Sequence, residues 1–208
     1  MYLLGLFPKS LLDLLRRASF VVVMLPLAHS LSAQKVASFQ TFLKGFAPTT
    51  LPYQPGSRMG EAIAEELAEA FLGQIQGDEY AYDFSNAFYV EKLPAQKSYV
   101  AFVVFNALVW EEEQSFEEVY YLCTFGLEGK FIDCIALQVN LQRAISENQT
   151  RHIEQIEGSI ESSGRILLKI HITDEYTDEQ SGETTRSESK ENKSYQLQPN
   201  GKIKEIRP

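Results

Sequence analysis

The chain has 208 residues, with 28 Asp and Glu against 19 Lys and Arg, a formal net charge of −9, 44% hydrophobic residues and two cysteines. This length suits one globular domain, or one domain and a processed segment, and the apolar content is sufficient for a buried core. The composition excludes a disordered polymer, a cysteine-dense framework and a collagen-like repeat. An acidic chain without a Lys/Arg-rich block is unsuited to binding phosphates, so we expect no nucleic-acid partner.

The beginning of the chain has the layout of a secretory signal. Residues 1–17 carry three bases and one acid, the apolar run ASFVVVMLPLA follows at 18–28, and the small and polar residues HSLSAQ come next. These are the positive, apolar and cleavage regions of an export signal. The alternative is an uncleaved membrane anchor, but the run is shorter than the roughly 20 residues that span a bilayer, and Pro26 interrupts it. We predict a signal peptide at 1–33, cleaved after Ala33.

Export would change the charge balance of the working protein. Residues 1–33 contain three of the bases and one of the acids, so their removal would leave 175 residues with 27 acids and 16 bases, a net charge of −11. Such a field repels anionic lipid and favours cations or basic protein surfaces. The sequence therefore predicts an acidic periplasmic or extracellular protein with no membrane span in the mature chain.

Two helices are expected ahead of the main β region. Residues 34–56 are predicted to hold a short helix, in SFQTFLKGF at 38–46, and a Pro-rich connector that cannot continue it. A second helix is expected to be capped by Ser57 and to continue through Leu72, because apolar residues recur there on one face.

From residue 79 onward the apolar period changes from helical to two. Short segments rich in Tyr, Phe, Val and Ile are separated by turn residues, which predicts an antiparallel meander of six to eight strands. The fold class predicted is α+β, with one domain at 57–208 and the second helix on one face of the sheet. The segments are 79–91, 98–109, 116–125, 130–139, 150–161, 164–177 and 194–206.

Two turn regions are predicted near the end of the chain. Residues 174–193, DEYTDEQSGETTRSESKENK, contain almost no apolar side chains, which favours an acidic, mobile hairpin loop. Pro199–Asn200–Gly201, between two short alternating runs, predicts a tight turn.

The two cysteines lie in one predicted hairpin, TFGLEGKF and its flanks. A turn with a bulge that pairs Gly126 with Lys130 places Phe125 opposite Phe131, Tyr121 opposite Ile135 and Val119 opposite Leu137, with the thiols on opposite faces. A two-residue turn instead places Cys123 directly opposite Cys134, where an oxidising compartment permits a disulfide. The sequence leaves both registers open, and Cys123–Cys134 is the candidate disulfide.

Metal sites have weak support in the sequence. His152 and His171 occur on neighbouring predicted strands, so they could meet beside Glu154 or Glu157. A polar histidine on a half-exposed strand needs no such role, and we expect no metal site. A calcium site is the remaining hypothesis in the acidic loop, although it lacks EF-hand spacing; its residues would be Asp174, Glu175, Asp178 and Glu179.

Catalytic and cofactor motifs are not found. The chain contains no G-x-S-x-G, H-E-x-x-H, C-x-x-C or Gly-rich phosphate loop, so no catalytic residue and no cofactor is predicted. Pairs of acids are abundant, which leaves a glycosidase-like carboxylate mechanism as an alternative. Most aromatic side chains are expected in the core, while some could reach a cleft and bind an apolar, peptide or sugar ligand.

A resemblance to a known group rests on four short stretches. The SAQ end of the signal, Leu51–Pro52–Tyr53, the YYLCTF-turn-GKFID hairpin at 120–133 and the terminal NGKI resemble secreted β-rich proteins of Bacteroidetes-type bacteria. The resemblance implies a β-rich fold and export, and it implies no activity. The sequence therefore predicts an exported acidic binding or interaction module, and a cell-envelope hydrolase using paired carboxylates is the alternative.

Overall fold

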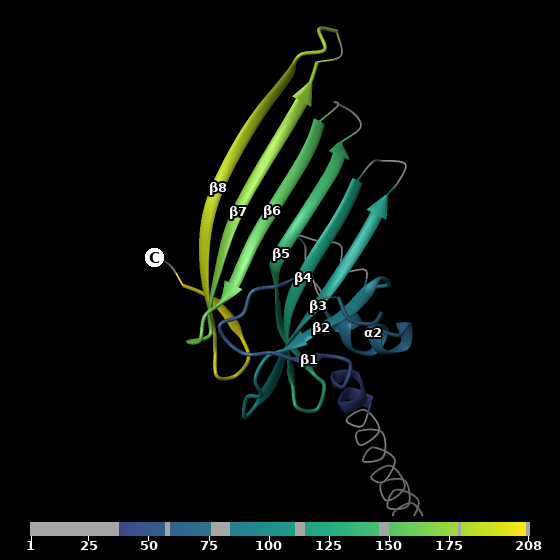
Figure 1. Ribbon diagram of the computed structural model, residues 1–208, viewed down its shortest axis with the longest axis vertical. Helices are drawn as coiled ribbons and strands as arrows, with labels where there is room; N and C mark the ends of the chain where they lie inside the picture. Colours follow the sequence, from purple (N-terminus) through teal and green to yellow (C-terminus); the bar gives the residue numbers. More distant parts are fainter. Residues whose placement is uncertain are drawn as a thin grey trace, which may run out of the picture.

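The strands form one open nine-stranded sheet in which each strand lies beside the next one in the sequence (Figure 1). The computed structural model describes residues 38–208 apart from 57–58, 76–83, 111–114, 146–149, 179 and 207–208, so the predicted signal lies outside the described residues. The expected antiparallel meander is confirmed from β2 to β9. These are eight strands, within the predicted six to eight. The prediction missed β1, the ninth strand among the described residues, which runs parallel to β2.

The strand positions follow the alternating apolar pattern closely. Most predicted segments end within a few residues of the observed strands, because side chains on alternate positions are buried against the core. The strands are β1 (Ala47–Pro48), β2 (Ala87–Lys92), β3 (Tyr99–Trp110), β4 (Ser115–Gly126), β5 (Phe131–Ile145), β6 (Thr150–Ile160), β7 (Arg165–Thr177), β8 (Thr184–Leu197) and β9 (Ile203–Glu205).

The predicted loop at 174–193 was wrong. β7 continues through Thr177 and β8 begins at Thr184, so the connection is only a short turn in which Asp178 accepts hydrogen bonds from the backbone N–H groups of Gln180 and Ser181. Both faces of this hairpin meet solvent along most of β8, and therefore no apolar alternation marks the strand in the sequence. The predicted turn at Pro199–Asn200–Gly201 is confirmed, with Gly201 at a φ of 86°.

The helices are shorter than expected. Residues 38–43 are helical, as predicted. The helix expected from Ser57 to Leu72 was wrong over residues 59–64, and its expected cap, Ser57, lies outside the described residues. There Gly60 and Ile63 donate backbone hydrogen bonds to Tyr89 and Ala87 of β2, so the segment is extended along the sheet edge. The helix α2 covers only Glu65–Phe71 and is followed by a 3₁₀ turn, η1 (Leu72–Gln74). No helix among the described residues is long and apolar enough to cross a membrane.

A cluster of phenylalanines joins the helices to the sheet. Phe39 and Phe42 of the first helix lie with ring centroids 5.1 and 5.0 Å from that of Phe71 in α2. On the sheet side, Phe102 of β3 lies 5.4 Å from Phe42 and 5.2 Å from Phe125 of β4. All five side chains are almost fully buried. Each ring removes a large apolar area from water, so this cluster fixes the helices on one face of β2–β4.

Both predicted registers of the β4–β5 hairpin occur, in succession. Next to the turn, Gly126 donates to Lys130 and Phe125 lies opposite Phe131, as the bulged register predicts. A bulge then shifts the pairing, so that Cys123 lies opposite Cys134. The first register is therefore wrong at Tyr121, which pairs with Ala136 instead of Ile135. A second bulge, between Tyr120 and Tyr121, shifts the pairing again, so that Val119 pairs with Val139 instead of Leu137.

Strand β5 divides the sheet into two parts. It pairs with β4 from Phe131 to Gln142, but its pairing with β6 covers only residues 139–145. The first half of β5, residues 131–138, pairs with β4 but not with β6, because the C-terminal end of β6 and the strands beside it diverge from β5. The β8–β9 turn then folds against β4 and β5: the Thr124 hydroxyl donates to the Gly201 carbonyl at 2.7 Å, and Ile203 N donates to Asp133 Oδ2 at 2.9 Å.

Gly158 lies where β5 and β6 part, and its lack of a side chain is required there. A β-carbon built on it would overlap the carbonyl oxygen of Leu137. We expect Gly158→Ala to destabilise the fold by roughly 2–4 kcal/mol, since backbone must move. The matched control is Gly73→Ala, whose β-carbon would meet nothing within 4 Å and should change stability by less than about 1 kcal/mol. Equal midpoints of the two variants in urea unfolding would contradict this account.

Candidate functional site

A groove of about 390 Å³ lies where β5 and β6 separate. The first half of β5 forms one wall, and one face of β6–β8, called here the groove face, forms the rest. Its volume is within the range of small-molecule sites. The lining residues are Cys134, Ile135, Ala136, Glu154, Ile156, Leu168, Ile170, Ile172, Glu191, Lys193 and Tyr195.

The floor of the groove follows from the alternation of β7. In RILLKIHI every second side chain is apolar and points to the groove face, and Ile156 of β6 lies directly opposite Ile170. Leu168 and Ile156 are buried, whereas Ile170 and Ile172 are only half-buried. The groove therefore has partly exposed aliphatic side chains above a closed apolar layer.

The charged residues of the groove carry a net charge of −1. Glu154 comes from β6, and Glu191 and Lys193 come from β8. Lys193 Nζ lies 3.5 Å from Glu191 Oε2, so these two charges largely offset each other. With two carboxylates and one ammonium in its lining, on a chain of net charge −9, the groove has an electrostatic preference for cations.

The two cysteines meet at one wall of this groove. Cys123 and Cys134 occupy opposite positions on β4 and β5, with Sγ atoms 3.2 Å apart and both thiols free. Cys134 is half-buried and lines the groove, whereas Cys123 is completely buried behind it. Burial, and then the contact with Cys134, raise the pKa of the Cys123 thiol well above its usual value. The exposed member of the pair is therefore the one that reagents in the groove can reach.

A row of ion pairs crosses the groove face beyond the groove. Glu117 of β4 is completely buried and accepts a hydrogen bond from Arg143 Nη2 at 2.8 Å. Its other oxygen, Oε1, has no hydrogen-bond partner among the described residues. Next to Arg143 in the ladder, His152 Nδ1 lies 2.7 Å from Asp174 Oδ1. These ion pairs lie beyond the apolar floor of the groove, and none of their residues lines it.

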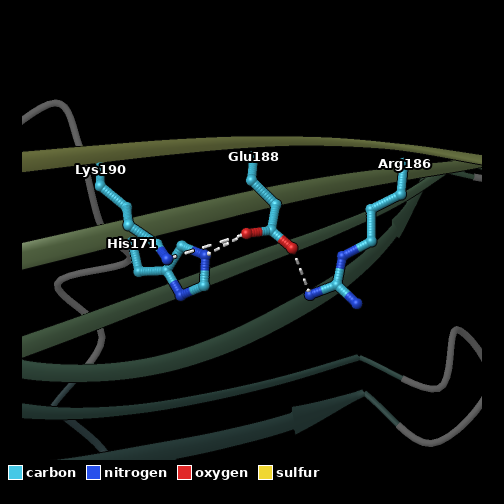
Figure 2. Close-up of polar contacts among 4 residues, drawn as sticks. All are labelled: His171, Arg186, Glu188 and Lys190. Atoms are coloured by element: carbon cyan, nitrogen blue, oxygen red, sulfur yellow. Dashed lines mark hydrogen bonds and ion pairs between the residues drawn. The ribbon is translucent and has the colours of Figure 1, made fainter.

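The opposite face of β7 and β8, called here the outer face, carries a separate charged cluster (Figure 2). His171, Arg186 and Lys190 surround the Glu188 carboxylate, at 3.3, 3.0 and 4.0 Å. The hydrogen bond from His171, and then the Arg186 charge, lower the pKa of Glu188. These pairs are solvent-exposed, and each contributes little to stability.

The predicted metal ligands do not converge. His152 lies opposite Asp174 on the groove face, whereas His171 lies opposite Gln155 on the outer face, so the hypothesis that both histidines share one ion is wrong. Of the calcium candidates, Asp174 and Glu175 also point to opposite faces, and Asp178 caps the β7–β8 turn. Glu179 lies outside the described residues. Within the part of the chain that the structure describes, no three metal-ligating side chains gather.

The site residues that the sequence reasoning missed are those of the groove. Ile170, Ile172, Glu191, Lys193 and Tyr195 were not singled out, because their strands read as ordinary alternation or as loop. The sequence shows the alternation of apolar residues on β7, but it does not show that β5 and β6 separate and thereby expose these residues. The aromatic side chains, as expected, are mostly in the core.

Comparison of the chain with models of known protein families, with characterised proteins and with solved structures finds no match.

The cysteine pair gives a prediction about order of reactivity. In the native, reduced protein we expect the thiol of Cys134 to react with iodoacetamide in a Cys123→Ser variant. The thiol of Cys123 in a Cys134→Ser variant should react at least roughly tenfold more slowly, because burial raises its pKa and blocks access. In the unmodified chain, an oxidant should form one intrachain disulfide by bringing the sulfurs from 3.2 Å to about 2.05 Å. Intact-mass spectrometry measures both, and two free thiols after oxidation would end the disulfide hypothesis.

Proposed function

We propose that the protein is an exported, acidic binding module whose groove between β5 and β8 holds an aliphatic ligand with a positive charge. The observation that carries the proposal is the half-buried aliphatic floor in a lining of net negative charge. Burial of Ile170 and Ile172 by a ligand would remove apolar surface from water, which supplies affinity. The net charge of −1 from Glu154, Glu191 and Lys193 supplies selectivity for a cationic group.

The ligand class follows from what the groove can satisfy. Its polar residues lie on β6 and β8, whereas β7 between them contributes only aliphatic side chains. The polar residues are Glu154, Glu191, Lys193 and Tyr195. A sugar would bring many hydroxyl groups to a floor that offers them no hydrogen-bond partner, which is costly. An alkyl chain or an aliphatic side chain next to an amine meets both requirements. A small apolar molecule and a basic, apolar segment of a protein share this chemistry.

The rival function, a hydrolase acting through paired carboxylates, concerns the same groove, because Glu154 and Glu191 both line it. Lys193 forms an ion pair with Glu191, and the floor between the acids is apolar. These features favour retention of a ligand over attack on a polar bond, so binding is the function we propose.

Octylammonium and octanoate, which have similar chains and opposite charges, test the proposed ligand class. We expect octylammonium to bind more tightly than octanoate by about fivefold or more at low salt, with a dissociation constant below about 1 mM. Isothermal titration gives the affinities. As a second readout, octylammonium should slow alkylation of Cys134 in the Cys123→Ser variant, because that thiol lines the groove.

Two half-buried residues of β7 provide matched variants for this test. Ile170→Asn should abolish octylammonium binding, whereas Leu167→Asn, on the outer face, should leave it unchanged. Equal loss in both variants would show a general effect on the sheet. Equal affinity for both ligands, without protection of Cys134, would overturn the proposed site.

Export is the second part of the proposal and is tested separately. The charge and hydropathy layout of residues 1–33 and the resemblance to secreted proteins support it. When the full chain is expressed in a bacterium with the general secretion pathway, the protein recovered from the periplasm should begin at Gln34. Intact-mass measurement of that fraction is the check, and a chain that keeps residues 1–33 in the cytoplasm would contradict export.

A further inference from the structure

Strand β8 leaves a long, open sheet edge. Its inner edge pairs with β7 from Thr184 to Gln196, whereas on its outer edge β9 pairs only with residues 195–197. Among the described residues, none pairs in a strand with the outer edge over 184–194. Figure 1 shows this part of β8 as the curved margin of the sheet, above the short β9. Such an edge presents a row of backbone donors and acceptors to another strand.

The backbone groups that face outward are those of the even-numbered residues. Ser194 accepts a hydrogen bond from Ile206 N on the β9 side, whereas Leu197 N donates to Gly164 on the β7 side. The side to which the backbone N–H and C=O groups point alternates from one residue to the next along a strand, and the β7–β8 register contains no shift. The outward-facing residues of the open edge are therefore Thr184, Arg186, Glu188, Lys190, Asn192 and Ser194.

The order of charges along these outward-facing residues is complementary to that of a second copy of the strand running in the opposite direction. Glu188 and Lys190 lie on either side of Ser189, which is the centre of the open stretch 184–194. In an antiparallel pairing of two copies about Ser189, each Glu188 faces Lys190 of the other copy, and Arg186 faces Asn192. The pairing uses the whole open edge and ends where β9 begins. The opposed pairs 186–192 and 188–190 can each exchange two backbone hydrogen bonds, whereas the Ser194 carbonyl at the end of the stretch already accepts one from Ile206 N.

Neighbouring registers lack this match. A pairing centred on residue 188 places two Glu188 side chains against each other and Arg186 against Lys190. A pairing centred on residue 190 brings two Lys190 side chains together. Like charges directly opposite each other are destabilising in sheets, whereas opposite charges contribute roughly 0.2–1 kcal/mol. Charge thus excludes these two registers. A pairing centred on Ser187 also places opposite charges together, Arg186 with Glu188, but it pairs only residues 184–190. The register about Ser189 is therefore the one that combines the charge match with pairing along the whole open edge.

We propose that two copies of the chain join through β8, antiparallel and centred on Ser189, into one continuous sheet. The contact is isologous, so it closes with two chains and leaves neither β8 edge open. The charged residues that discourage pairing with an unrelated edge favour pairing with a second copy. Glu191 and Lys193 of the groove lie within the paired stretch, opposite Ser187 and Thr185 of the second copy. The contact itself uses the outward backbone groups and the even-numbered side chains of the outer face, so it does not require the proposed ligand.

The dimer is tested by charge exchange on one pair of residues. Sedimentation equilibrium of the purified protein at low salt should show a monomer–dimer equilibrium. Glu188→Lys alone, or Lys190→Glu alone, should weaken the dimer by about tenfold, because two like-charge contacts replace two favourable ones. The double variant Glu188→Lys with Lys190→Glu should restore it, since the pairing is again between opposite charges.

Amide hydrogen exchange provides a readout for the backbone contact. The amides of Arg186, Glu188, Lys190 and Asn192 should become protected as protein concentration rises, while their odd-numbered neighbours, already bonded to β7, should not change. Glu188→Pro removes an outward N–H and no bond to β7, so it should abolish the dimer and keep the fold.

Three results would overturn the proposal. The first is a protein that stays monomeric at millimolar concentration. The second is a dimer that the single charge variants do not weaken or the double variant does not restore. The third is a dimer without concentration-dependent protection of the even-numbered amides. Each would assign the edge no role in self-association, whatever the groove binds.

Discussion

The rest of the structure depends on the limited pairing between β5 and β6. Their ladder extends only from Val139–Ile156 to Ile145–Thr150, because β5 is bulged near Leu137 and the carbonyl of Leu137 occupies the space above Gly158. Two bulges shift the β4–β5 register, yet β5 stays paired with β4 from Phe131 to Gln142, whereas it pairs with β6 only over Val139–Ile145. The two halves of the sheet are therefore joined along only part of β5. The groove, the folded-back β8–β9 turn and the open β8 edge all lie on the β6–β9 side of this separation.

The two halves are stabilised by different means. Around β2–β5 the phenylalanine cluster and the helices bury large apolar areas, and most side chains on the strands are inaccessible to water. Along β7 and β8, beyond the groove, both faces are exposed to solvent. The backbone ladder and short cross-strand pairs, such as His152 with Asp174 and the contacts of Glu188, are what join those strands. Because an isolated two-stranded hairpin is at best marginally stable in water, β7 and β8 depend on the buried part of the sheet for their stability.

The proposed ligand groove and the proposed dimer edge meet on β8: odd-numbered side chains of this strand line the groove, and its even-numbered residues form the edge. Opposed residues in an antiparallel pair point to the same side, so the two-fold axis of the proposed dimer is perpendicular to the sheet. The grooves of both copies would therefore open to the same side of one extended sheet. If a partner carried two basic, apolar segments, both could bind at once, which raises the effective affinity without any new contact.

The sequence by itself determined the order of the strands from β2 to β7, the first helix, the final turn and the aromatic core, since each depends on local periodicity and turn chemistry. It did not determine that residues 60–63 pair with β2 instead of forming a helix, because the edge of β2 that accepts their hydrogen bonds comes later in the chain. It also did not show that the polar residues 184–194 are a strand, since both of their faces meet water. The sequence did not predict the groove either. In the sequence, Ile170 and Ile172 follow the same apolar alternation as fully buried strand residues. Only the separation of β5 from β6 in the tertiary structure decides which apolar side chains stay accessible to a ligand.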